Sequence, residues 1–246
     1  MNSRYERYKS HKQKIADVNF SEGILQWDME VNMPPKGGDF RSQQISTLAG
    51  IAHEFSTDDT FGKILEELAG DKSLSEKERR NVLESLKDFK RNKKYPKEFV
   101  DTLSRSISES VQVWTKAHTD SDFNSFAPHL EKLVELKRQE CEMLGYRNHP
   151  YDAMLDLYEP GTKTEDIEKL FIGVKAWLVG FVKEIASKPQ NNDSFMYKHY
   201  DKNKQWDFGI QLLKRMGFDF EAGRQDIPIT HSPSPLMQWM CVLPPA

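Results

Sequence analysis

Residues 122–146 read DFNSFAPHLEKLVELKRQECEMLGY, and the spacing of their apolar side chains decides the fold class. These side chains recur at steps of three and four residues, which is the period of an α-helix. They belong to Phe123, Phe126, Leu130, Leu133, Val134, Cys141 and Leu144. Asp122 suits the N-cap position, and Gly145 suits the left-handed conformation that ends many helices. The stretch therefore predicts one helix over residues 123–144.

The same period continues through most of residues 1–226, where glycine is sparse and the alternation typical of strands is nearly absent. Ser75 and Glu78 form a capping-box pattern, and Pro96 suits the first turn of the next helix. Beyond the first long helix, which a proline pair at 34–35 ends, the predicted helices cover approximately residues 40–54, 75–94, 96–118, 164–187 and 204–216. We predict an all-α, multi-helix protein of about eight or nine helices.

Composition excludes several classes of protein. The 246 residues include 35 basic and 38 acidic side chains, a net charge of −3, so no excess of positive charge indicates a nucleic-acid partner. The two cysteines, Cys141 and Cys241, provide neither a disulfide framework nor a zinc pattern. Residues 1–14 lack the apolar core of a signal peptide, and no apolar run reaches the roughly 18 residues of a membrane span. We expect a cytoplasmic protein with no membrane partner.

His53 and Glu54 form the single adjacent His-Glu pair of the chain and are the first candidates for a metal site. A helical zinc site of the His-Glu-x-x-His type needs a second imidazole one turn further on, and Thr57 occupies that position. Two adjacent side chains on a helix do not share a face and cannot chelate a metal alone. We therefore interpret His53 as a surface or packing residue.

The other candidate ligands are equally sparse. His129 and His149 each lie beside a proline, and no carboxylate-rich spacing connects them, so helix capping or packing is the favoured role. Asp152, Asp156 and Glu159 approximate one helical face. They suit either a carboxylate cluster for metal or acid–base chemistry or a solvated acidic face.

The basic segment Lys87–Lys94, followed by Tyr95, is a candidate nucleic-acid patch. Asp88 interrupts it, and the same predicted helix carries several glutamates, so a solvated helix face is favoured. Neither a glycine-rich phosphate loop nor a nucleophile elbow occurs in the chain. From the residues alone we assign no catalytic residue and no metal ligand, and the substrate-binding residues are unknown.

Several motifs together carry more information than composition. Residues 24–38 read ILQWDMEVNMPPKGG and precede Arg41, Gln44, Leu48-Ala49-Gly50 and His53-Glu54. With residues 122–146, HPYDA at 149–153, YEPG at 158–161, GFDFE at 217–221, Gly223-Arg224 and Asp226, this pattern resembles the carboxypeptidase Taq family of zinc-dependent metallocarboxypeptidases. The matches follow the family order and extend over nearly all of residues 20–226.

The resemblance implies a mostly helical, usually dimeric, cytoplasmic enzyme that removes C-terminal residues from peptides with a divalent metal, generally zinc or cobalt. The catalytic motifs of that family come later in its chain: His-Pro-Phe, Asp-x-Arg-x-Thr, and a helical His-Glu-x-x-His with a downstream glutamate. None of these motifs occurs in this sequence. The resemblance thus implies that residues 1–226 are the helical N-terminal part of a metallocarboxypeptidase domain, without a cofactor in this chain.

Residues 227–246 differ from the rest, because they hold five of the twelve prolines and no charged side chain. Regrouping each codon's third base with the first two bases of the next codon forces aspartate at Trp239-Met240 and valine at Met240-Cys241. The shifted frame also permits HPF and DVRITTR, which resemble the later family motifs. We interpret residues 227–246 as an irregular tail that arises from a one-nucleotide frameshift soon after Asp226.

Two functions from different classes follow. We expect a fragment of a metal-dependent carboxypeptidase that is inactive alone, and the alternative is a non-catalytic helical module that dimerises or binds peptide ends. A third hypothesis is that the frameshift is an artefact of sequencing or gene prediction. Resequencing around the codon for Asp226 discriminates among these hypotheses.

Overall fold

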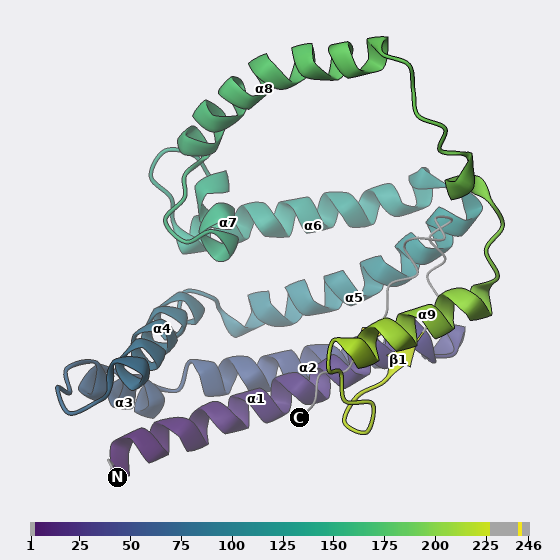
Figure 1. Cartoon of the computed structure of the whole chain (residues 1–246). Helices are drawn as coiled ribbons and strands as arrows, with labels where there is room; N and C mark the ends of the chain where they lie inside the picture. The colour runs from purple at the N-terminus through teal and green to yellow at the C-terminus, as the bar shows by residue number, and fades with distance from the viewer. Residues whose placement is uncertain (1–2, 227–240, 243–246) are drawn as a thin grey trace. The chain divides into compact units, whose positions relative to one another are not determined.

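The structure, a computed structural model, describes residues 3–226 and 241–242. The regular secondary structure of these residues is almost entirely helical (Figure 1). The elements are α1 (Ser3–Val31), η1 (Pro35–Gly37), α2 (Gly38–Ser56), α3 (Asp59–Ala69), α4 (Glu76–Asn92), α5 (Lys97–Asp120), α6 (Phe123–Leu144), α7 (Tyr151–Tyr158), α8 (Thr164–Ser187), η2 (Ser194–Tyr197), α9 (Lys202–Arg215), β1 (Gln225–Asp226) and β2 (Cys241–Val242). The predicted all-α, multi-helix architecture is confirmed. Of the described helices, none is long and apolar enough to cross a membrane.

The chain divides into two compact units, chiefly Met1–Leu144 and Gly145–Gln225. The boundary lies at Gly145, whose φ of +77° places it in the left-handed region that favours glycine. This is the helix end predicted from the sequence. Both compact units lie mainly within residues 1–226. Of the expected tail at 227–246, only β2 lies among the described residues.

In the first unit, α2 packs against both α1 and α5, and α6 packs against α5, so these four long helices form a row (Figure 1). The shorter helices α3 and α4 pack on each other, and α3 also contacts α1. A buried core lies where these three helices meet; it contains Tyr5, Tyr8, Ile15, Phe61, Leu65, Leu68 and Val82. The Tyr8 hydroxyl is satisfied there by the hydroxyl of Ser85 at 3.0 Å. The first unit thus has a hydrophobic core of its own.

The ends of α4 and α5 follow local sequence signals. Glu78 donates its backbone N–H to the Ser75 hydroxyl, while its carboxylate accepts the Ser75 backbone N–H at 2.9 Å, which completes the predicted capping box. Pro96 is the N-cap of α5 rather than part of its first turn. Its ψ of 147° is extended, so the helical conformation begins one residue later, at Lys97.

The apolar stripe that predicted α6 is a correct helix signal, but only part of it is buried. Phe123, Leu130 and Val134 are exposed, whereas Leu136, Glu140 and Cys141 are buried. The buried face of α6 is therefore rotated from the apolar stripe toward α5, which is the helix it contacts. A charged residue, Glu140, occupies a position that binary patterning would give to an apolar one.

The second unit has little buried interior. Ala153 on α7 is its buried apolar residue among those described, and α8 buries no residue. The large apolar side chains of α8 are exposed instead; they are Leu170, Phe171, Ile172, Val174, Trp177, Leu178, Val179, Phe181, Val182 and Ile185. Such a helix normally lies inside a larger fold.

Candidate functional site

The His53-Glu54 pair lies on α2, and the structure separates the two side chains. Glu54 is exposed and accepts a hydrogen bond from the Lys97 ammonium group of α5. This bond and the charge of Lys97 lower the pKa of the Glu54 carboxyl. Thr57, at the position of the second imidazole of a zinc motif, donates its hydroxyl to the His53 carbonyl at 2.8 Å. Glu54 therefore belongs to a surface ion pair, whereas His53 lines a pocket described below.

The basic segment around Lys87–Lys94 forms ion pairs within the first unit. Lys93 contacts the Asp59 carboxylate at 2.7 Å, and Arg91 lies 3.8 Å from Asp88. Lys94 donates to the backbone carbonyl of Leu144 at the end of α6. Lys93 and Lys94 thus connect the end of α4 to α3 and α6, while Arg91 pairs within α4.

The second unit places its candidate ligands in a capping arrangement around the loop between α7 and α8. The His149 Nδ1 accepts the backbone N–H of Tyr151, the first residue of α7, at 3.1 Å. Asp152 accepts both the backbone N–H and the hydroxyl of Thr164, at 2.8 and 2.6 Å, and these bonds lower the pKa of its carboxyl. Asp156 accepts the backbone N–H of Gly161 at 2.9 Å.

These contacts explain why the three acidic residues do not gather. Asp152 orders the start of α8, Asp156 orders the turn at Gly161, and Glu159 is exposed. His129 belongs to the first unit and His149 to the second, so neither unit holds both. Across residues 3–226 and 241–242 there is no group of three or more His, Cys, Asp or Glu side chains that could hold a metal ion.

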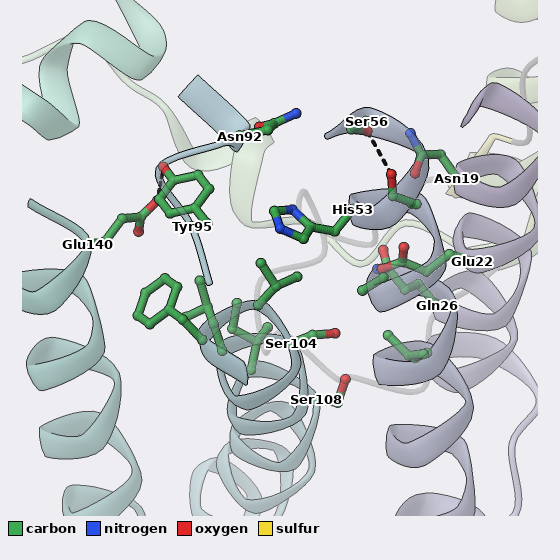
Figure 2. A pocket seen from close by; sticks show the side chains of 17 residues that line it. Asn19, Glu22, Gln26, His53, Ser56, Asn92, Tyr95, Ser104, Ser108 and Glu140 are labelled. Atoms are coloured by element: carbon green, nitrogen blue, oxygen red, sulfur yellow. Dashed lines mark hydrogen bonds between the residues drawn. The ribbon is translucent and has the colours of Figure 1, made fainter. Parts of the chain in front are cut away.

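A pocket that the sequence analysis did not predict lies inside the first unit, with a volume of about 420 Å³ (Figure 2). Its walls come mainly from α1, α2 and α5, with single residues from the end of α4 and from α6. The His53 ring points into it, with Tyr95 and Glu140 on one side and Glu22 and Gln26 on the other (Figure 2). Apolar side chains of α2 and α5 complete the lining.

Tyr95 and Glu140 form the buried polar side of this pocket. The Tyr95 hydroxyl donates to Glu140 Oε1 at 3.0 Å, and Lys137 donates to the other carboxylate oxygen at 2.7 Å. Glu140 is only 6% exposed, so both donors offset the cost of removing its charge from water. Burial, followed by the adjacent Glu140 carboxylate, raises the pKa of the Tyr95 phenol. The pair therefore keeps the phenol protonated and the carboxylate hydrogen-bonded.

Glu22 contributes the second acidic group of the pocket, from α1. Burial raises the pKa of its carboxyl, and a hydrogen bond from Gln26 Nε2 at 2.9 Å partly opposes that shift. Among the lining side chains in the described part of the chain, His53 is the one that can carry a positive charge. The pocket thus combines two acidic groups with one basic side chain, so it favours a neutral or cationic group over a carboxylate.

No sequence pattern predicts this pocket, because its polar residues are scattered over a long stretch of chain. Glu22, His53, Tyr95 and Glu140 lie on four different parts of the first unit and meet only through helix packing. Neither a motif nor a common spacing connects them. The burial of Glu140 could not be predicted either, since a glutamate in an amphipathic helix is ordinarily assigned to the solvent face.

Comparison with solved structures defines the class of fold. The chain superposes on the BsuCP crystal structure with a TM-score of 0.87 and 27% identity. The superposition covers 93% of this chain and 46% of the BsuCP chain. The M32 carboxypeptidase of Deinococcus radiodurans gives a TM-score of 0.76 and 29% identity, with the same coverage of both chains. The helices therefore have the arrangement found in part of a metallocarboxypeptidase.

The chain belongs to the carboxypeptidase Taq (M32) metallopeptidase family, whose model matches residues 7–233. Carboxypeptidase 1 of Bacillus subtilis is 30% identical over 215 residues, which are 87% of this chain and 43% of that protein. The chain thus spans less than half the length of the relatives it matches. The family resemblance identified from the sequence motifs is confirmed.

Proposed function

We propose that this chain is the N-terminal, non-catalytic part of a metal-dependent carboxypeptidase that removes C-terminal residues from peptides, and that it does not hydrolyse peptides alone. The observation that carries the proposal is the extent of the match. Most of this chain aligns with 43% of carboxypeptidase 1 of Bacillus subtilis, yet the 246 residues contain no His-Glu-x-x-His motif. A zinc peptidase needs such a ligand set to bind its metal and activate water.

The donor set of this chain does not fit the metal that the family name implies. His53 has a hydrogen-bonded threonine where a second imidazole would be required, and Glu54 is engaged by Lys97. Asp152 and Asp156 accept backbone N–H groups at separate turns. We therefore assign the zinc or cobalt of the proposed full-length enzyme to residues outside this sequence.

The remaining features of the proposal extend the family assignment. The full-length form acts on peptides, is located in the cytoplasm and forms a homodimer, and the tail at residues 227–246 results from a one-nucleotide frameshift. The forced aspartate and valine of the alternate frame support the frameshift. The tail lies almost wholly outside the described residues, so the support comes from sequence alone.

The test is to restore one base after the codon for Asp226 and to express the resulting gene. We expect a longer protein that releases C-terminal residues from peptides when zinc or cobalt is added and that chelators inhibit. The original 246-residue chain, assayed in parallel, is expected to be inactive. A stop codon within the next few dozen shifted codons, or a longer protein inert with both metals, would contradict the proposal.

The alternative function, a non-catalytic helical interaction module, draws support from the separate core of the first unit. A unit with its own core can fold without the rest of an enzyme. The pocket argues against one form of this alternative, because a site for a peptide C-terminus needs positive charge and this pocket has two acidic residues, Glu22 and Glu140. A monodisperse chain with a sharp thermal transition and no binding of hydrophobic dye would favour the module over the enzyme fragment.

A further inference from the structure

The pocket inside the first unit has no role in the proposed function, although its volume of about 420 Å³ lies in the range of small-molecule sites. It extends across the row of four long helices. Glu22 belongs to α1 and Glu140 to α6, the two outer helices of the row, whereas the inner helices α2 and α5 supply the apolar wall. The two carboxylates therefore lie on opposite sides of the pocket, with apolar surface between them (Figure 2).

Each of these carboxylates is accompanied by at least one side-chain amide. Asn19, Glu22 and Gln26 follow one another on α1 at steps of three and four residues, so they share a face. Gln26 Nε2 donates to Glu22 Oε1 at 2.9 Å, and Glu22 Oε2 has no hydrogen-bond partner among the described residues. On the other side, Asn92 joins Glu140 in the lining. Both sides can therefore accept several hydrogen bonds from one ammonium group, which has three donors and no acceptor.

The acidic groups on both sides retain capacity for a further cation. Burial raises the pKa of the Glu22 carboxyl, and a cation beside it would favour the charged form. At Glu140, Tyr95 and Lys137 donate one hydrogen bond to each oxygen, whereas an ionised carboxylate offers about four acceptor positions. The Lys137 side chain is 48% exposed, so its charge is partly satisfied by water.

The separation of the two carboxylates decides which kind of cation fits. Across residues 3–226 and 241–242, no group of three or more His, Cys, Asp or Glu side chains could hold a metal ion, so Glu22, His53 and Glu140 do not converge on one point. Axes of packed helices lie about 8–10 Å apart, and both α2 and α5 intervene between the helices that carry the two glutamates. One small ion cannot contact both carboxylates, whereas a molecule with a cationic group at each end can.

We propose that this pocket binds a linear α,ω-diamine, with one ammonium group at Glu22, the other at Glu140, and the methylene chain against the apolar wall of α2 and α5. A monoamine would leave one of the two carboxylates without a cation. The site is separate from peptide hydrolysis, so it is present whether or not the longer protein made by restoring one base is a peptidase.

The first experiment is isothermal titration calorimetry of the 246-residue chain with diamines from 1,3-diaminopropane to 1,10-diaminodecane. It is carried out at pH 8, where free alkylamines are charged. We expect saturable binding with one optimal chain length. The monoamine of that length should bind about 10-fold more weakly or worse, since it lacks one pair of charge-assisted hydrogen-bonding partners.

Three results of this titration would overturn the proposal. They are the absence of saturable binding by any diamine, equal affinities of the diamine and the monoamine, and an affinity that rises steadily with chain length without an optimum. The last result would indicate apolar contact alone. Because the length series uses the unmodified chain, it decides the question even if a substituted protein fails to fold.

A matched pair of substitutions then assigns one end of the ligand. E22Q removes the charge and keeps the shape of the side chain, and E30Q removes a charge from an exposed position of the same helix that does not line the pocket. In E22Q we expect the affinities for the diamine and the monoamine to agree within about 2-fold, while E30Q retains the preference of the parent. An unchanged preference in E22Q, or the same loss in both variants, would contradict the proposed contact.

Discussion

Glu140 is an unusual residue of the first unit, because its side chain is ionisable and almost fully buried. Tyr95 and Lys137 supply its two hydrogen-bond donors, one to each oxygen. Two hydrogen-bond donors offset part of the cost of burying a charge, and removal of one donor leaves more of the desolvation penalty uncompensated. The stability of the pocket wall therefore depends on the Tyr95 hydroxyl.

Replacing Tyr95 with phenylalanine removes that hydroxyl and keeps the ring that packs on Phe99. We expect Y95F to lower the free energy of unfolding by about 1.5–3 kcal/mol, the range for hydrogen bonds to charged groups. Urea denaturation measures the change. The control is Y158F, at a tyrosine that is 85% exposed, for which we expect no measurable change. A Y95F protein as stable as the parent would show that Lys137 alone satisfies Glu140.

The same phenol predicts how stability responds to alkaline pH. Burial and the Glu140 carboxylate raise the pKa of Tyr95 in the folded chain above its ordinary value of 10.0. As the pH rises through about 10, the unfolded chain therefore loses this proton first, and the free energy of unfolding falls. We expect a shallower decline for Y95F when urea midpoints are compared between pH 8 and 11. Parallel declines for the two proteins would contradict this linkage.

The helix ends are the elements that local sequence determines most directly. The Ser75 capping box satisfies backbone groups at the start of α4. We expect S75A to cost about 1 kcal/mol of unfolding free energy, with S73A in the adjacent turn as its control. Helical circular dichroism during denaturation reports both. Equal costs at the two serines would mean that the cap does not stabilise α4 beyond an ordinary turn hydrogen bond.

Burial distinguishes two leucines that sequence patterning treats alike. Leu65 on α3 is 0% exposed, and Leu170 on α8 is 59% exposed. We expect L65A to lower the free energy of unfolding by about 2–5 kcal/mol, because it leaves a cavity in the core. For L170A we expect a change within about 0.5 kcal/mol. A large loss at Leu170, measured by the same thermal melts, would reveal packing of α8 in this chain.

Sequence periodicity and capping residues predicted the ends of several helices, and α8 coincides with the prediction over residues 164–187. No helix was predicted over the residues of α3, although Asp58 caps this helix by accepting the Phe61 backbone N–H at 2.8 Å. Phe61, Leu65 and Leu68 recur at the helical period on one face of this short helix, so the sequence does carry a signal for it. The pocket could not be predicted, because the packing of separate helices brings Glu22, His53, Tyr95 and Glu140 together.

At the scale of the whole molecule, the ligand geometry predicts how the chain behaves toward zinc. His53 and His149, which lie beside the candidate ligands Glu54 and Asp152, each have neighbours engaged in other hydrogen bonds. We expect the purified 246-residue chain to retain no stoichiometric zinc after dialysis. Metal analysis by mass spectrometry is the measurement. One zinc per chain that survives dialysis would overturn this expectation, and H53A and H149A variants would then locate it.

The two units differ in what holds them together. The first has a core of seven buried residues, whereas the second has a long helix without a buried side chain. Each large apolar side chain left in water forgoes up to about 1.5–3 kcal/mol, and a typical protein has a margin of only about 5–15 kcal/mol. Tertiary burial therefore stabilises the first unit, while the second depends on its local helices.

In a living cell, we expect the exposed apolar surface of α8 to shorten the lifetime of the chain. Chaperones and proteases continually sort unfolded and partly folded chains. Phe171 and Trp177 would be presented to them from the moment of synthesis. The abundance of the protein would then depend on the rate of degradation relative to the rate at which this helix becomes buried.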